Sequence, residues 1–146
     1  MSAEKPGRPS IPIVFQGPQQ NLAPPEEVRI RGLRARPLGG RRVRMEIDLT
    51  PFQMRPDVSV QVTDGEGREV GRMEIVHVMT PHITLTLHLR EPEPKGEYTL
   101  TAAVRYPPPE YRYLRQDDPR AQTEAVPQQA IPMVAVHRAA VKFTVS

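Results

Sequence analysis

The feature that most constrains the fold is a two-residue alternation of apolar and polar side chains, present between residues 26 and 106 and again near the C-terminal end. From Val43 to Leu49, apolar residues occupy every second position, and Arg, Glu and Asp lie between them. Successive side chains of a β-strand point to opposite faces, so such a run has one buried and one solvated face. This pattern is typical of antiparallel sheets packed face to face.

Turn residues separate the alternating runs. Further runs lie at 58–63, 83–89, 98–105 and 139–145. Gly39-Gly40 and Thr80-Pro81 interrupt the pattern, and Asp64-Gly65-Glu66-Gly67 predicts a hairpin. No helical period of useful length occurs. We therefore predict an all-β chain, folded as an antiparallel β-sandwich or a jelly-roll-like barrel of about seven or eight strands.

The segment Lys95-Gly96-Glu97-Tyr98-Thr99-Leu100 resembles the start of strand F in immunoglobulin-like and fibronectin-like sandwiches. In that architecture a tyrosine just after the turn anchors the corner through its hydroxyl, which implies this role for Tyr98. The likeness covers roughly residues 27–106 and 133–146, lacks the disulfide and core tryptophan of antibody domains, and implies no function. The alternative is a buried tyrosine of the kind found in any β-sandwich.

Twelve of the eighteen prolines lie in two stretches, residues 6–25 and 107–132. Proline has a fixed φ and no backbone N–H, so we predict that residues 1–25 form an extended arm rather than a core strand. Residues 26–146 are then a single β domain with a long proline-rich loop at 106–133. The arm contains five consecutive apolar residues, Ile11 to Phe15, which a disordered linker would not need.

This apolar block of the arm is a candidate interface, formed by Ile11, Ile13, Val14 and Phe15. Burying these side chains would contribute on the order of 6–10 kcal/mol, and ordering five backbone units would cost about 5–10 kcal/mol. Because the two terms nearly cancel, stable docking needs main-chain pairing to a sheet edge or several copies in an assembly. The block either clasps a neighbour or folds back on its own domain as an edge strand.

The long loop carries three of the four tyrosines of the chain. Tyrosine and arginine are frequent interface anchors. The candidate interface residues of the loop are Tyr106, Tyr111, Arg112, Tyr113 and Leu114. The alternative is an exposed loop whose tyrosines pack on their own stems.

Residues 29–44 contain seven arginines and no acidic residue, although the whole chain has a net charge of only +3. We interpret this stretch as a candidate surface for an anionic partner, nucleic acid or an acidic protein surface. Its residues are Arg29, Arg31, Arg34, Arg36, Arg41, Arg42 and Arg44. The alternative is a solvated face paired with nearby Glu and Asp. No nucleic-acid-binding motif and no interleaved aromatic residue accompanies the arginines, which disfavours nucleic acid.

Chemistry-bearing patterns are missing from the sequence. His82 and His88 share a strand face but lie about 20 Å apart, too far for one metal ion, and the chain has no cysteine. No catalytic triad order or glycine-rich phosphate loop occurs. We therefore expect no enzymatic activity, no metal and no cofactor. The first residues lack an apolar run of signal-peptide length, so we also expect use without secretion and no membrane partner.

The proline-rich arm Pro6–Pro25, its block Ile11–Phe15 and the loop 106–133 together resemble capsid decoration (cement) proteins of tailed bacteriophages, and the Arg- and Pro-rich composition resembles those of thermophilic hosts. The resemblance implies a thermostable, non-enzymatic homotrimer on the virion surface that ties major capsid protein subunits together, with the arginine stretch facing an acidic capsid surface. One alternative is a cytoplasmic or cell-envelope immunoglobulin-like protein–protein interaction module. A second is a nucleic-acid-binding β-barrel that uses Arg29–Arg44.

Overall fold

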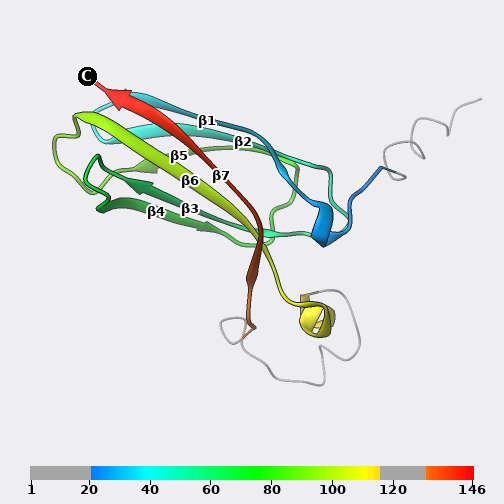
Figure 1. The fold of residues 1–146 in the computed structure, drawn as a ribbon. Helices are drawn as coiled ribbons and strands as arrows, with labels where there is room; N and C mark the ends of the chain where they lie inside the picture. The colour runs from blue at the N-terminus through cyan, green and yellow to red at the C-terminus, as the bar shows by residue number, and fades with distance from the viewer. Residues whose placement is uncertain (1–20, 116–130) are drawn as a thin grey trace, which may run out of the picture.

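Within residues 21–115 and 131–146, which the computed structural model describes, the chain forms two antiparallel sheets with strand orders β1-β2-β5 and β4-β3-β6-β7 (Figure 1). The strands are β1 (Ile30–Gly39), β2 (Arg42–Leu49), β3 (Asp57–Thr63), β4 (Glu69–Ile75), β5 (His82–His88), β6 (Gly96–Tyr106) and β7 (Val134–Val145). The prediction of an all-β antiparallel sandwich with about seven strands is confirmed. The apolar block Ile11–Phe15 lies outside the described residues.

Apolar side chains at alternate strand positions meet in one core between the sheets. The inward side chains of β6 are all at most 1% exposed: Tyr98, Leu100, Ala102, Val104 and Tyr106. From the other sheet, Met45 and Ile47 of β2 are fully buried. Burying a large apolar side chain contributes about 1.5–3 kcal/mol. Burial of the alternating apolar side chains is therefore the main contribution to the packing of the two sheets.

The hairpin predicted at Asp64–Gly67 joins β3 to β4, and the side chain of Asp64 organises it. Oδ1 of Asp64 accepts hydrogen bonds from the backbone N–H groups of Glu66 and Arg68, each at 2.9 Å. Gly67 adopts a φ of +84°, a left-handed conformation that favours glycine. These hydrogen bonds also lower the pKa of Asp64, because they stabilise its charged form.

The predicted boundary between arm and domain at residue 25 needs correction. Ala23 forms a parallel bridge with Phe52, its N–H donates to Pro51 O at 2.8 Å, and its side chain is buried. Pro25 starts a 3₁₀ turn, η2 (Pro25–Glu27), and is also buried. Proline suits the first position of such a turn because no N–H is needed there. The folded unit thus includes the last residues assigned to the arm.

The loop prediction also needs refinement, since its first part has regular structure. A 3₁₀ helix, η3 (Pro109–Arg115), follows β6 and projects away from the sandwich (Figure 1). Residues 116–130 lie outside the described part, and the chain re-enters β7 at Val134. No helix in the described ranges is long and apolar enough to cross a membrane.

The sandwich is closed along one side and open along the other. On the closed side β1 and β7 pack side by side, and the Ile30 N–H donates to His137 Nδ1 at 2.9 Å (Figure 1). On the open side β4 and β5 approach each other much less, and the Arg90 N–H donates to Val70 O at 2.7 Å at one end only. The open side therefore leaves part of a sheet edge uncovered.

Candidate interaction surfaces

Strand β5 is a sheet edge without the usual protection. In the part of the chain that the structure describes, no strand pairs with its outer edge. Its sequence, HITLTLH, contains no Asp, Glu, Lys, Arg or Pro, and it pairs with β2 from His82 to His88 without a register shift. Natural edge strands are usually blunted by charges, proline or bulges, because free N–H and C=O groups recruit further strands. β5 is thus suited to accept a strand.

Strand β4 covers only one end of β5. At that end Arg90 N–H binds Val70 O, and the Arg90 guanidinium binds Glu69 Oε2 at 2.8 Å. The approach is so close that a Cβ on Gly71 would lie 2.8 Å from Leu87 Cδ2, closer than van der Waals contact allows. Glycine at this position therefore lets the two sheets meet.

Away from that end, apolar side chains of the open side are in contact with solvent. Leu85 occupies an inward-facing position of β5, opposite Met45 in the β2 register, yet its side chain is 36% exposed. The next inward residues of β4 beyond Gly71, Met73 and Ile75, are half-buried. The inward-facing side chains at this side of the sandwich are therefore apolar and only partly buried.

The loop between β4 and β5 presents two further apolar side chains. Val76 is 61% exposed and Met79 is 68% exposed, whereas Val78 between them is buried. The backbone is held in place, because His77 N–H donates to Asp57 Oδ1 at 3.0 Å and Val78 N–H donates to Pro56 O at 2.8 Å. We call Val76, Met79, Leu85 and the free edge of β5 the β5 edge surface.

His77 adopts a φ of +54°, which is uncommon for a residue other than glycine. This left-handed conformation costs an L-residue roughly 1–2 kcal/mol. Such conformations persist where the surroundings enforce them, and they cluster at functional sites. The two hydrogen bonds and the buried Val78 enforce it here, so that its neighbours Val76 and Met79 face solvent.

The sequence interpretation missed the β5 edge surface. The sequence predicts a break only at Thr80-Pro81, whereas β4 already ends at Ile75. A signal was present, because the pairs Ile75-Val76 and Val78-Met79 are adjacent apolar residues that break the two-residue alternation. One member of each pair faces the core and the other has to face solvent.

Tyr106 was predicted to be an interface anchor, and this prediction is wrong. Its side chain is fully buried, and its hydroxyl donates to Met54 O at 2.6 Å. Burial raises the pKa of Tyr106, so the hydroxyl stays protonated and remains a donor. The sequence contained the correct assignment, since Tyr106 continues the inward-facing series that starts at Tyr98.

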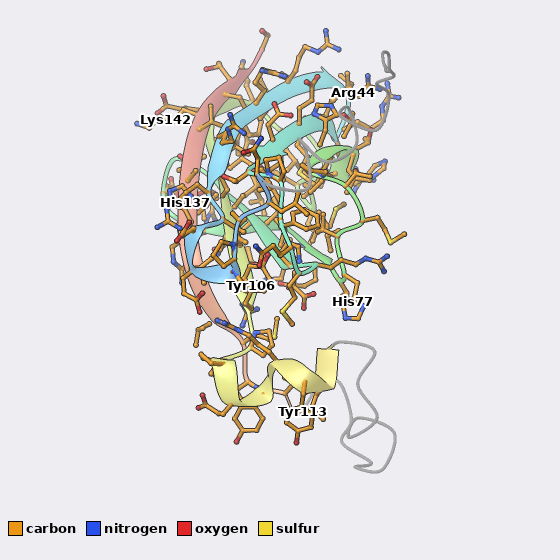
Figure 2. The ribbon with its side chains drawn as sticks, turned by 90° about the vertical axis from the view of Figure 1, so that its right-hand side faces the viewer. Arg44, His77, Tyr106, Tyr113, His137 and Lys142 are labelled. Carbon is orange, nitrogen blue, oxygen red and sulfur yellow. The ribbon has the colours of Figure 1, made fainter. Side chains whose placement is uncertain are left out.

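Of the other predicted loop anchors, Arg112 is used within the chain. Its guanidinium pairs with Glu26 Oε2 at 2.6 Å and donates to Pro107 O at 3.0 Å, which ties η3 to η2. This pairing lowers the pKa of Glu26. Tyr111 is 40% exposed, and Tyr113 and Leu114 are half-buried. Figure 2 shows Tyr113 at the opposite end of the molecule from Arg44.

Tyr98 has the corner geometry expected from the sequence. Its hydroxyl accepts a hydrogen bond from the Lys95 N–H at 3.0 Å and donates to Glu91 Oε1 at 2.5 Å. Burial and the neighbouring Glu91 carboxylate raise the pKa of Tyr98, which keeps the hydroxyl a donor. Its ring stacks on Phe143 at a centroid distance of 5.6 Å. Tyr98 thus fixes the turn before β6 to the core.

The seven predicted arginines divide into three groups. Arg34 pairs with Glu46 at 2.6 Å and lies 3.9 Å from Asp48, as the solvated-face alternative requires. The hydrogen bond from His82 lowers the pKa of Asp48 most, and the charges of Arg34 and Arg31 lower it further. The Arg29 and Arg42 guanidinium groups donate to backbone carbonyl groups instead. The side chains of the remaining three make no hydrogen bond or ion pair with any described residue: Arg36, Arg41 and Arg44.

His82 and His88 do not come together. The ring of His82 binds the Asp48 carboxylate through Nδ1 and contacts Thr84 through Nε2. This hydrogen bond is the main reason why the pKa of Asp48 is lowered. Among the described residues, no group of three His, Asp or Glu side chains converges in a way that could hold a metal ion.

No protein-family model matches the chain, and no curated protein does. Among solved structures, Ruminococcus gnavus β-glucuronidase in complex with uronic isofagomine aligns with 82% of this chain at 12% identity and a TM-score of 0.42. The apo form of that protein aligns with 82% of the chain at 12% identity and a TM-score of 0.40. This chain spans 15–16% of the length of those chains. Similarity at this level supports no conclusion about activity or substrate.

Proposed function

We propose that this chain is a non-enzymatic assembly protein that associates with further copies of itself at the β5 edge surface. The observation that carries the proposal is the unprotected edge of β5, which contains no charged residue, proline or bulge. An added strand would gain main-chain hydrogen bonds from this edge and apolar contacts from Leu85, Val76 and Met79.

The strand that fits this edge is the apolar block Ile11–Phe15 of a neighbouring copy. The energy balance of this block is close to zero without main-chain pairing, and an edge strand supplies that pairing. Exchange of arms between copies would give a closed homo-oligomer, and the resemblance to capsid decoration proteins favours a trimer. In its most specific form, the proposal is a capsid decoration protein whose many copies strengthen a shell by mass action.

The test is the native mass of the full-length chain, of a chain lacking residues 1–20, and of Leu85→Lys. An inward-pointing lysine on an edge strand opposes strand addition. We therefore expect both altered chains to be monomers under conditions in which the full-length chain is an oligomer. Val134→Lys is the matched control, because Val134 is 48% exposed on an outer strand of the second sheet, β7. The deletion stops at residue 20 because Ala23 and Pro25 belong to the domain.

A monomeric full-length chain at every concentration, or an oligomer unchanged by Leu85→Lys, would contradict self-association at this edge. A monomer favours the second candidate, an immunoglobulin-like module that binds a strand of another protein. The corner formed by Tyr98, Lys95 and Glu91 supports that alternative. Strand binding by a monomer would still depend on Leu85, so the same variant remains informative.

A further inference from the structure

The outer face of the β1-β2-β5 sheet consists of cross-strand rows whose charges are unevenly distributed. Two rows contain acidic residues, Arg34–Glu46–Thr84 and Gly32–Asp48–His82. The two rows toward the β1–β2 turn contain none, Arg36–Arg44–Thr86 and Gly39–Arg42–His88. Arg41 lies in the turn itself. We call Arg36, Arg41, Arg42 and Arg44 the arginine end of this sheet.

In the rows with acidic residues, each carboxylate has a side-chain partner within the sheet. Arg34 binds Glu46 at 2.6 Å, and the Arg34 guanidinium lowers the pKa of that carboxyl. Asp48 binds His82 on the same face. In this half of the sheet, a carboxylate on the neighbouring strand forms an ion pair with an exposed arginine.

At the arginine end, no described residue provides such compensation. Arg36 and Arg44 are directly opposite each other in the β1–β2 register, and like charges in this position are destabilising. Within the described ranges, the side chains of Arg36, Arg41 and Arg44 have no hydrogen-bonding or ionic partner, and Arg42 donates only to Leu38 O at 3.3 Å. Figure 2 shows Arg44 at the end of the sandwich away from η3. The fold thus accepts an unfavourable charge pair on an exposed face.

We infer that the arginine end binds an acidic segment of a protein partner, whose carboxylates take the place that Glu46 and Asp48 fill in the neighbouring rows. Two opposed guanidinium groups can each bind a carboxylate in bidentate fashion. Strands β1, β2 and β5 contain no Phe, Tyr or Trp, so this face offers no platform for nucleic-acid bases. The inference rests on the proposed function in one respect, namely that the partner is a protein.

The experiment measures the fluorescence anisotropy of a labelled oligoglutamate peptide titrated with the full-length chain at low salt. Arg36→Gln/Arg44→Gln should weaken binding by about tenfold, and added salt should weaken binding to the unaltered chain. The matched control is Arg55→Gln/Arg138→Gln, which removes the same charge at two exposed arginines outside this sheet. The control should retain the affinity of the unaltered chain.

A second readout separates binding from structure. Because Arg36 and Arg44 repel each other, Arg36→Gln/Arg44→Gln should leave the denaturation midpoint unchanged or raise it, whereas a merely structural pair would lower it. Equal peptide affinity of variant and control would overturn the inference. So would binding of a labelled DNA duplex that depends on Arg36 and Arg44 when the peptide does not bind. Leu85→Lys should leave peptide affinity intact, which separates this test from that of the proposed function.

Discussion

The two edge strands of the β1-β2-β5 sheet differ in how well they are protected against strand addition. β1 carries Arg31, Arg34, Arg36 and Pro37, has register shifts near both of its ends, and packs against β7. β5 has no charged residue, no proline and no register shift, and β4 approaches only one end of it. Both strands flank β2 and contribute to the same core. The difference therefore lies in how each edge is protected against strand addition, and not in its contribution to the core.

This contrast shows that protection of an edge strand is a local property. The devices on β1 are those that prevent unwanted strand addition. Their absence from β5 coincides with the exposed apolar residues Val76, Met79 and Leu85. Lack of edge protection alone does not explain why a conformationally constrained loop places exposed apolar side chains beside this edge. The coincidence is the reason to treat the β5 edge surface as functional.

The largest effect on stability is expected from Gly71→Val, at the end of β5 that β4 covers. The added side chain would overlap Leu87, which is 2% exposed and has little room to move. We expect a loss of about 3 kcal/mol in the free energy of unfolding, measured by urea denaturation. Gly65→Ala is the control, because the nearest atom to a Cβ there is Glu97 O at 3.8 Å. Equal stability of Gly71→Val and the unaltered chain would show that β4 does not cover the end of β5.

A smaller effect is expected on the closed side from His137→Ala. The Ile30 N–H loses its acceptor in a partly buried position, which should cost about 1–2 kcal/mol of unfolding free energy. His88→Ala on the exposed edge of β5 should change stability by less than about 0.5 kcal/mol. Equal decreases in unfolding free energy for His137→Ala and His88→Ala would contradict a stabilising contact between β7 and β1.

The smallest effect concerns Glu69, which links β4 to Arg90 at the covered end of β5. Hydrogen bonds from Arg72 and Arg90 lower the pKa of Glu69 from 4.5 to about 2. A depressed carboxyl pKa in the folded state stabilises the fold above pH 4.5, and this contribution disappears as the pH falls toward 2. Glu69→Gln should therefore lose less stability than the unaltered chain between pH 4.5 and 2, as followed by thermal denaturation. The same dependence of thermal stability on pH in the two proteins would contradict a stabilising role of the Glu69 carboxylate.

The strands could be predicted from the sequence because alternation is a local signal. Tyr98 and the Asp64–Gly67 hairpin were also predictable, since each depends on neighbours within a few residues in the chain. Tyr106 carries two conflicting signals: an aromatic side chain beside a proline run favours an interface, whereas its position in the alternating series favours the core, where it lies. Its partner, Met54 O, is 52 residues away in the sequence.

The candidate surfaces depend on pairings that local patterns do not specify. Which strand becomes an unprotected edge follows from the order β1-β2-β5, and no feature within residues 82–88 gives that order. The arginine stretch was recognised as a unit, but its division into satisfied and unsatisfied residues follows from the β1–β2 register. That register places Arg34 opposite Glu46 and Arg36 opposite Arg44.

The left-handed conformation of His77 also bears on the thermodynamics of any contact made by the β5 edge surface. Val76 and Met79 sit on a backbone that is already ordered, so a partner that covers them would lose little conformational entropy in this loop. Burial of their apolar surface would instead give a negative change in heat capacity on binding. Calorimetry at several temperatures, with Val76→Ser/Met79→Ser as the comparison, would therefore measure the part of this change that the loop contributes.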